Sequence, residues 1–90
     1  MLTKVTEVKW LGGHRLFVRF KDGSCGEHDF ADVIFKPGEA NIPLRDPAYF
    51  ARVYLDHGAP SWLNGYDMAP EWLWHEMEKA GELHREIAAE

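Results

Sequence analysis

The histidines are the first side chains in this sequence that could do chemistry. There are five, at His14, His28, His57, His75 and His84. No two of them stand four residues apart, which is the spacing that puts two imidazoles on one face of a helix as metal ligands. The segment that begins at His75 lacks the second histidine of the metalloprotease motif. We therefore expect no metal site and interpret these histidines as ordinary exposed or half-buried residues.

The single cysteine, Cys25, is the candidate for covalent chemistry, and it excludes a disulfide within the chain. A cysteine becomes a good nucleophile when a base or a helix N-terminus lowers its pKa. Cys25 instead lies on an expected strand just after a turn, so we interpret it as a structural or exposed thiol. Gly12-Gly13 lacks the spacing of a phosphate-binding loop. We predict no catalytic residues and no cofactor, and expect a protein that is not an enzyme. A carboxylate or histidine pair that the sequence does not single out is the remaining route to catalysis.

Residues 62–74 are the most unusual stretch, because they hold three of the four tryptophans. Trp72 and Trp74 are about 200° apart around a helix, so both cannot face the same core. Two interpretations stay open. In one, Trp62 and Leu73 are core residues while Trp72 and Trp74 line the rim of the helix. In the other, the tryptophans form an exposed aromatic patch, a feature enriched at protein interfaces.

The composition is that of one small globular domain. The chain has 90 residues, of which 46% are hydrophobic and 28% charged, with a formal net charge of -5. This acidity argues against direct nucleic-acid binding, which depends on Lys and Arg neutralising phosphates, and it suits a basic partner. No apolar run approaches the roughly 20 residues of a membrane span, and the start of the chain does not have the pattern of a signal peptide. We expect a cytoplasmic protein without membrane contact.

The N-terminal third has the pattern of a β-meander. Strands are predicted over residues 3–11, 15–20 and 24–30, with a bulge near Thr6-Glu7. Asp22-Gly23 predicts a hairpin with a type I′ turn, in which both residues have positive φ. The basic residues of these strands are interpreted as outer-face residues that pair with acids such as Glu7 and Glu27. Phe17 interrupts that polar face, so we expect a helix, a second copy or another protein to cover it.

The rest of the chain predicts two helices and two short strands. Asp46-Pro47 is the start of a short helix, with Asp as N-cap and Pro at the first position. Strands are expected over residues 53–55 and 61–63, and a helix from Pro70 through Lys79. Residues 81–90 are expected to form a frayed helical tail. The predicted fold is thus a single α+β domain over residues 1–90, with a mainly antiparallel sheet, one short helix and a C-terminal helix.

Several short motifs in this order resemble a known bacterial family. They are Phe20-x-Asp22-Gly23, Asp29-Phe30, Leu44-x-Asp46-Pro47-x-x-Phe50-x-x-Val53 and Trp62-x-Asn64-Gly65-x-Asp67-x-x-Pro70-Glu71. Over about residues 4–75 the chain resembles the family catalogued as domain of unknown function 2442, DUF2442. The resemblance implies a small α+β domain with no established activity. The family's genes often stand beside that of a second small domain, which implies a paired system of the toxin–antitoxin kind.

Two departures from the family limit what the resemblance implies. Some members carry a helix-turn-helix module after the domain, but here only about twenty residues follow the last motif, which is too few for one, so we do not expect direct DNA binding. His28 occupies a place where apolar residues are common. It is therefore expected to be half-exposed or to form a hydrogen bond in the core.

Our leading hypothesis is a non-enzymatic interaction module that binds a small protein partner, in the role of the acidic, antitoxin-like half of an operon-encoded pair. Self-association is the other form of binding that would cover the surplus aromatic residues. The candidate interaction surface comprises Phe17, Trp62, Tyr66, Trp72 and Trp74. The alternative hypothesis is a small-molecule or nucleotide-binding domain with an aromatic pocket near Trp62 and Tyr66.

Overall fold

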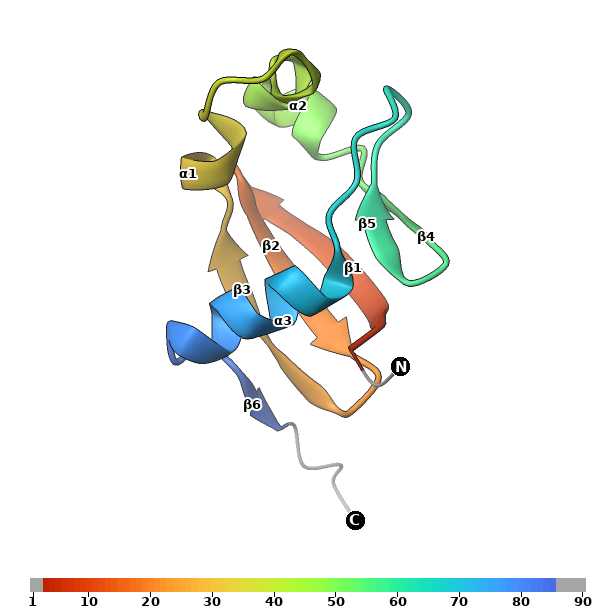
Figure 1. Ribbon diagram of the computed structural model, residues 1–90, viewed down its shortest axis with the longest axis vertical. Coiled ribbons are helices and arrows are strands. Elements are labelled where there is room, and N and C mark those ends of the chain that lie inside the picture. Colours follow the sequence, from red (N-terminus) through yellow and green to blue (C-terminus); the bar gives the residue numbers. More distant parts are fainter. Residues whose placement is uncertain (1–2, 86–90) are drawn as a thin grey trace.

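The structure, a computed structural model, describes residues 3–85 and contains a four-stranded sheet of order β1-β2-β3-β6. The first three strands form the predicted antiparallel meander, and a short strand from the C-terminal part of the chain pairs antiparallel with β3 (Figure 1). The strands are β1 Val5–Gly12, β2 Arg15–Phe20, β3 Ser24–Asp29 and β6 His84–Arg85. The α+β class with a mainly antiparallel sheet is therefore confirmed.

The first hairpins confirm the predicted bulge but correct the predicted turn. The pairing of β1 with β2 is irregular between Val5 and Glu7, where the bulge was expected. At the next turn Gly23 has a φ of 92°, but among the described residues only His57 combines a side chain with positive φ. Asp22 therefore cannot be part of a type I′ turn. The Gly23 N–H closes the turn on the Phe20 carbonyl at 3.0 Å, with glycine in the left-handed position that follows a type I turn.

The segment between β3 and the last helix is built from short elements. It contains α1 Ala31–Ile34, the 3₁₀ turns η1 Glu39–Asn41 and η2 Pro43–Arg45, α2 Pro47–Phe50, β4 Tyr54–Asp56 and β5 Ala59–Ser61. Helix α2 begins as predicted, because the Asp46 carboxylate accepts the Ala48 N–H at 3.0 Å and Pro47 takes the first position. Strand β5 lies two residues before the predicted one. Trp62 leaves the strand because its backbone N–H donates to the Tyr66 carbonyl.

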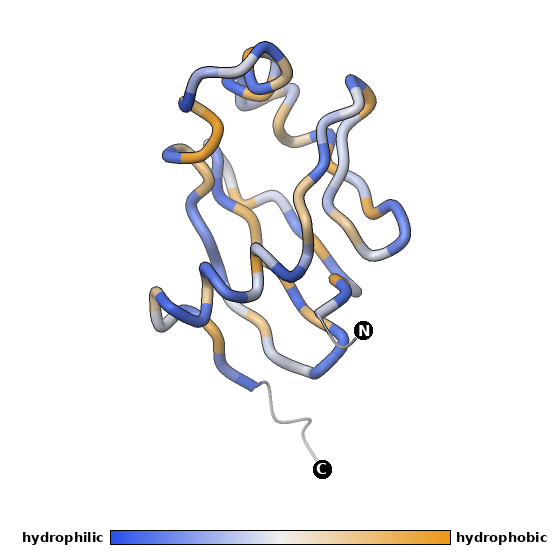
Figure 2. The backbone as a smooth tube through the Cα atoms, in the orientation of Figure 1, coloured by the Kyte–Doolittle hydropathy of each residue, from blue (hydrophilic) through white to orange (hydrophobic). Residues whose placement is uncertain are grey.

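The hydrophobic core lies between one face of the sheet and α3, Pro70–Lys79 (Figure 1). Helix α3 is mostly hydrophilic along its length in Figure 2. Only a narrow stripe of the helix, Leu73 and Met77, is buried in the core. The core is completed by side chains from every part of the described chain: Val5, Leu16, Val18, Phe20, Phe30, Ile34, Leu44, Phe50, Trp62 and Met68. Leu16, Val18 and Phe20 alternate with outward-facing residues along β2, as the period of a strand requires.

Phe17 therefore lies on the face of the sheet opposite α3. This position excludes the C-terminal helix as its cover. The Arg19 guanidinium lies 5.4 Å from the centre of the Phe17 ring, and Phe17 is half-buried. The expected ion pairs are present on the same face, with Arg15 Nη2 2.8 Å from Glu27 Oε1 and Arg19 Nε 3.1 Å from Glu7 Oε1.

After α3 the chain turns back to the sheet. Gly81 has a φ of 73° and follows the end of the helix, as a left-handed C-terminal glycine does. His84 and Arg85 then pair with Cys25 and Ser24 as β6. The predicted helical tail is therefore wrong for these two residues, and the rest of that tail lies outside the described residues. Within residues 3–85, no helix is long and apolar enough to cross a membrane.

Gly26 allows this return. A Cβ atom at Gly26 would lie 2.1 Å from the Glu82 carbonyl oxygen and 3.4 Å from Met77 Cε. The first distance is far shorter than a van der Waals contact, so only glycine lets the chain after α3 approach β3 this closely.

We predict that Gly26→Ala lowers the free energy of unfolding by about 3 kcal/mol, because the backbone at Glu82 has to move. Gly13→Ala is the control. Gly13 has a φ of 55° and open space around it, so that variant bears only the left-handed strain of about 1 kcal/mol. Urea unfolding of both variants measures the difference. Equal losses would show that the close approach at Gly26 costs nothing to disrupt.

Candidate functional site

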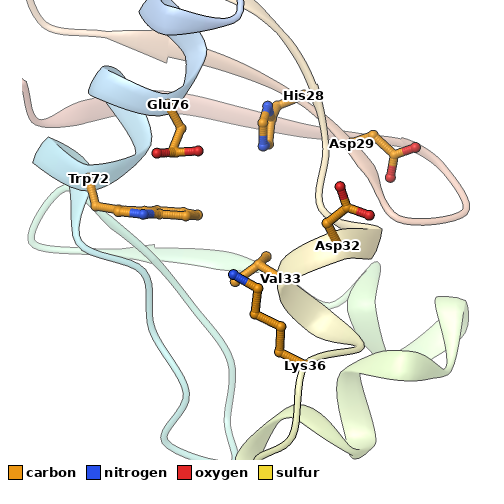
Figure 3. Close-up of a pocket in the computed structure, with 7 residues that line it drawn as sticks. All are labelled: His28, Asp29, Asp32, Val33, Lys36, Trp72 and Glu76. Atoms are coloured by element: carbon orange, nitrogen blue, oxygen red, sulfur yellow. The ribbon is translucent and has the colours of Figure 1, made fainter.

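A hollow in the described surface lies between α1, the end of β3 and α3. It has a volume of about 460 Å³. Strand β3 contributes two lining residues, α1 and the residues just after it contribute three, and α3 contributes two (Figure 3). The lining residues are His28, Asp29, Asp32, Val33, Lys36, Trp72 and Glu76. We call this hollow the Trp72 pocket.

Trp72 is the aromatic wall of this pocket and differs from the other tryptophans. Its residue surface is 38% exposed, and its indole extends from α3 into the pocket (Figure 3). Among the described residues its indole N–H donates no hydrogen bond. Each of the other three does: Trp10 to the Gly13 carbonyl, Trp62 to the Phe50 carbonyl, and Trp74 to Asp22 and Ser24. The fold thus leaves Trp72 without a polar partner.

Trp72 also lines another, smaller hollow. This hollow has a volume of about 190 Å³ and is also lined by Tyr66 and Met68. Burial raises the pKa of the Tyr66 phenol above its ordinary value, and the nearby Asp67 carboxylate adds to this effect. Tyr66 therefore stays neutral and presents an uncharged hydroxyl beside Trp72.

The other predicted surface residues do not join this aromatic pair. Trp62 is 1% exposed and stacks on Phe50 with ring centres 5.3 Å apart, so its prediction as an interaction-surface residue is wrong. It lies in the core together with Leu73, as the first of the two interpretations stated. Phe17 lies on the opposite face of the sheet, and Trp74 is half-buried. Trp72 is the tryptophan that helix geometry turns away from the core.

Trp74 anchors α3 to the hairpin turn. Its indole N–H lies 3.2 Å from Asp22 Oδ2 and 3.2 Å from the Ser24 hydroxyl. The partial burial of Asp22 raises the pKa of its carboxyl, but hydrogen bonds from Ser24 and Trp74 and the charge of Arg85 outweigh this effect and leave the pKa below its ordinary value. The ionised Asp22 therefore helps to hold the helix that carries Trp72.

Carboxylates dominate the charge of the Trp72 pocket. Asp29, Asp32 and Glu76 line it together with one lysine, Lys36. Asp29 accepts the Ala31 N–H at 2.9 Å, which bends the chain into α1, and Glu76 pairs with the exposed Lys79 at 3.2 Å. Asp32 and Lys36 form no ion pair within residues 3–85.

His28 forms the wall of the pocket on the sheet side. Its side chain is 16% exposed, and its Nδ1 lies 2.7 Å from Glu82 Oε1. The ring also packs edge-on against Phe30, with centres 4.7 Å apart. From the sequence we expected His28 either to be half-exposed or to form a hydrogen bond in the core. The structure shows a largely buried ring that forms a hydrogen bond. Glu82 was not identified as its partner from the sequence, because it is 54 residues away.

Cys25 also has a partner that was not identified from the sequence. Its Sγ lies 3.7 Å from His84 Nε2, because β6 pairs with β3 at this point. The thiol is fully buried and does not line the Trp72 pocket. Within residues 3–85, no group of three or more His, Cys, Asp or Glu side chains is arranged to hold a metal ion.

Comparison with known proteins identifies the family. Residues 5–79 match the model of the family described as "Protein of unknown function (DUF2442)", and the chain belongs to this family. No curated protein and no solved structure matches the chain.

We predict that Asp22→Asn lowers the free energy of unfolding at pH 7 by about 1 kcal/mol, the value of a weakened hydrogen bond. Because the folded-state pKa of Asp22 is depressed, its stabilisation is complete above the unfolded-state pKa and is lost as the pH falls through the folded-state pKa. The deficit of the variant should therefore shrink as the pH is lowered from 7 through the acid range below the ordinary pKa of aspartate. Urea unfolding across this range measures it, with Glu78→Gln on the exposed side of α3 as the control. A deficit independent of pH would contradict the role of the ionised carboxylate.

Proposed function

We propose that this member of the DUF2442 family is a non-enzymatic interaction module that binds a small protein partner through the Trp72 pocket. The observation that carries the proposal is the state of Trp72, a half-exposed indole whose N–H donates no hydrogen bond among the described residues. A partner that covers this ring removes apolar surface from water and supplies an acceptor for the N–H.

The surroundings of Trp72 favour a protein partner. Tryptophans at the centre of a concave surface with a polar rim are typical binding hot spots. Here Val33 and Trp72 line both hollows, so a partner side chain seated in either hollow lies next to Trp72. Carboxylates around the larger hollow supply the polar rim.

A binding role without catalysis is supported by the lining of the pocket. His28 is held by Glu82 and is the natural candidate for a general base. Among the residues that line the pocket, no serine, threonine or cysteine stands ready to be activated by it. Cys25, the nucleophile candidate of the sequence, is buried elsewhere.

The narrower role is that of the antitoxin-like half of an operon-encoded pair. In this role the partner is the product of a neighbouring gene. The net charge of -5 then favours a basic partner, because opposite charges speed encounter and fix orientation.

A small-molecule site is the second candidate, and the pocket volume is the observation that favours it. Ligand sites are clefts of roughly 300–1,000 Å³, and the Trp72 pocket has about 460 Å³. The location differs from the alternative drawn from the sequence, because Trp62 is buried and the hollow beside Tyr66 has only about 190 Å³. The carboxylates of the Trp72 pocket disfavour the phosphates of a nucleotide.

We predict that the wild-type protein co-purifies with the product of an adjacent gene when the two are expressed together, and that Trp72→Ala weakens the complex at least about 10-fold, as loss of a hot-spot residue does. Trp10→Ala is the matched control. Trp10 is 43% exposed and does not line either hollow, so this variant should bind within about twofold of the wild type. Titration calorimetry of the purified pairs measures both. Absence of any complex, or equal binding by Trp72→Ala, would refute the proposal.

A further inference from the structure

We infer that the Trp72 pocket takes an arginine side chain from a basic segment of the partner. The guanidinium would stack on the Trp72 indole and face the carboxylates of Asp32 and Glu76. This inference rests on the proposed function and specifies the chemistry of the partner.

Three of the side chains that line the pocket are carboxylates, whereas Lys36 and the Trp72 indole N–H are donors. A backbone carbonyl of the partner segment, rather than the arginine side chain, would accept from the Trp72 N–H. Ionised Asp29, Asp32 and Glu76 can only accept. His28 is held by the Glu82 carboxylate, whose Oε1 lies 2.7 Å from its Nδ1. The complementary ligand group is therefore one that is rich in donors.

Because Trp72 forms the aromatic wall of the pocket, the donor-rich ligand group that fits best is a planar cation. A guanidinium is planar, carries five N–H donors and no acceptor, and stacks on aromatic faces, whereas an ammonium is compact and more strongly hydrated. The chain makes this kind of contact itself. The Arg19 guanidinium lies 5.4 Å from the centre of the Phe17 ring, and that of Arg45 lies 5.5 Å from the centre of the Phe35 ring. Trp72 offers a better face for such a contact than phenylalanine does.

The charge balance of the pocket agrees with a cationic occupant. The lining has three carboxylates and a single lysine, Lys36. The pair of Glu76 with Lys79 neutralises little of this charge, because the Lys79 side chain is 75% exposed and the pair is screened by solvent. Lys36 opposes a second cation, so its removal should improve binding.

The test uses a hexa-arginine peptide and the indole N–H resonances of the four tryptophans in ¹⁵N-correlated NMR spectra of the full chain. We expect the peptide to shift the Trp72 resonance and to leave that of the buried Trp62 in place. A hexa-citrulline peptide has nearly the same shape without the charge, and it should shift neither. A hexa-lysine peptide should bind more weakly than hexa-arginine, because it cannot stack.

Matched variants separate the pocket from general attraction to an acidic protein. Glu76→Gln should weaken hexa-arginine binding about 3- to 10-fold, whereas Glu78→Gln, which removes the same charge from another side of α3, should change it less than about twofold. Lys36→Gln should strengthen binding about threefold. Thermal unfolding of each variant verifies that the fold is intact.

The inference is overturned if hexa-arginine leaves the Trp72 resonance unmoved, or if Glu76→Gln and Glu78→Gln weaken binding equally. It is also overturned if free agmatine, a small guanidinium compound, binds more tightly than the peptide, since the pocket would then be a small-molecule site. If a protein partner binds through Trp72 but hexa-arginine does not bind, the arginine inference is refuted and the proposed interaction module is still supported. If hexa-arginine binds at Trp72 but no protein partner is found, the pocket's preference for arginine stands and the proposed interaction module is refuted.

Discussion

The packing of α3 against the sheet is the interaction on which the rest of the structure depends. Leu73 and Met77 bury one stripe of the helix, and the Trp74 indole binds the Asp22 turn beside it. At the C-terminal end of the helix the chain can return to β3 because Gly26 has no side chain. These contacts fix the rotation of α3. Once the rotation is fixed, Trp72 is directed away from Trp74 and toward α1, where it becomes the wall of a pocket.

This constraint explains why an apolar ring remains half-exposed in so small a protein. Three contacts constrain the helix. Leu73 fills the core, the Trp74 indole N–H donates to Asp22, and the chain after the helix packs against Gly26. A tryptophan at position 72 cannot contribute to any of them. In most positions of a protein the residue type suits its place in the fold. A large exposed ring that does not stabilise the fold is an exception, and such exceptions tend to mark functional positions.

The parts of the fold that the sequence predicted are those with strong local signals. The alternation from Arg15 to Phe20 and the proline at the start of α3 each determine an element from its own residues. Helix α1 has only four residues, too few for a helical period to show. Strand β6 exists because His84 pairs with Cys25, a contact between distant parts of the chain that no local pattern records. The type I′ turn failed because Asp22 uses its carboxylate to bind the Ser24 N–H at 2.8 Å and keeps its φ negative.

The same distinction holds for the site. Helix geometry alone predicted that Trp72 and Trp74 could not share the core, but not which of them would remain exposed. That choice depended on Asp22, fifty-two residues from Trp74. The polar half of the pocket was not predictable, because Asp32 stands on α1 and Glu76 on α3, and only the folded chain brings them to one hollow. The sequence therefore contained the aromatic residue of the site but not its surroundings.

Within residues 3–85, Trp72 is the tryptophan whose indole N–H donates no hydrogen bond. Hydrogen exchange of the four indole N–H groups tests this claim most directly. In the free protein we expect the Trp72 N–H to exchange fastest and the N–H of the buried Trp62 to exchange slowest. In the complex with the captured partner, the Trp72 N–H should become protected. A Trp72 N–H that is protected in the free protein, or that still exchanges freely in the complex, would contradict the role assigned to Trp72.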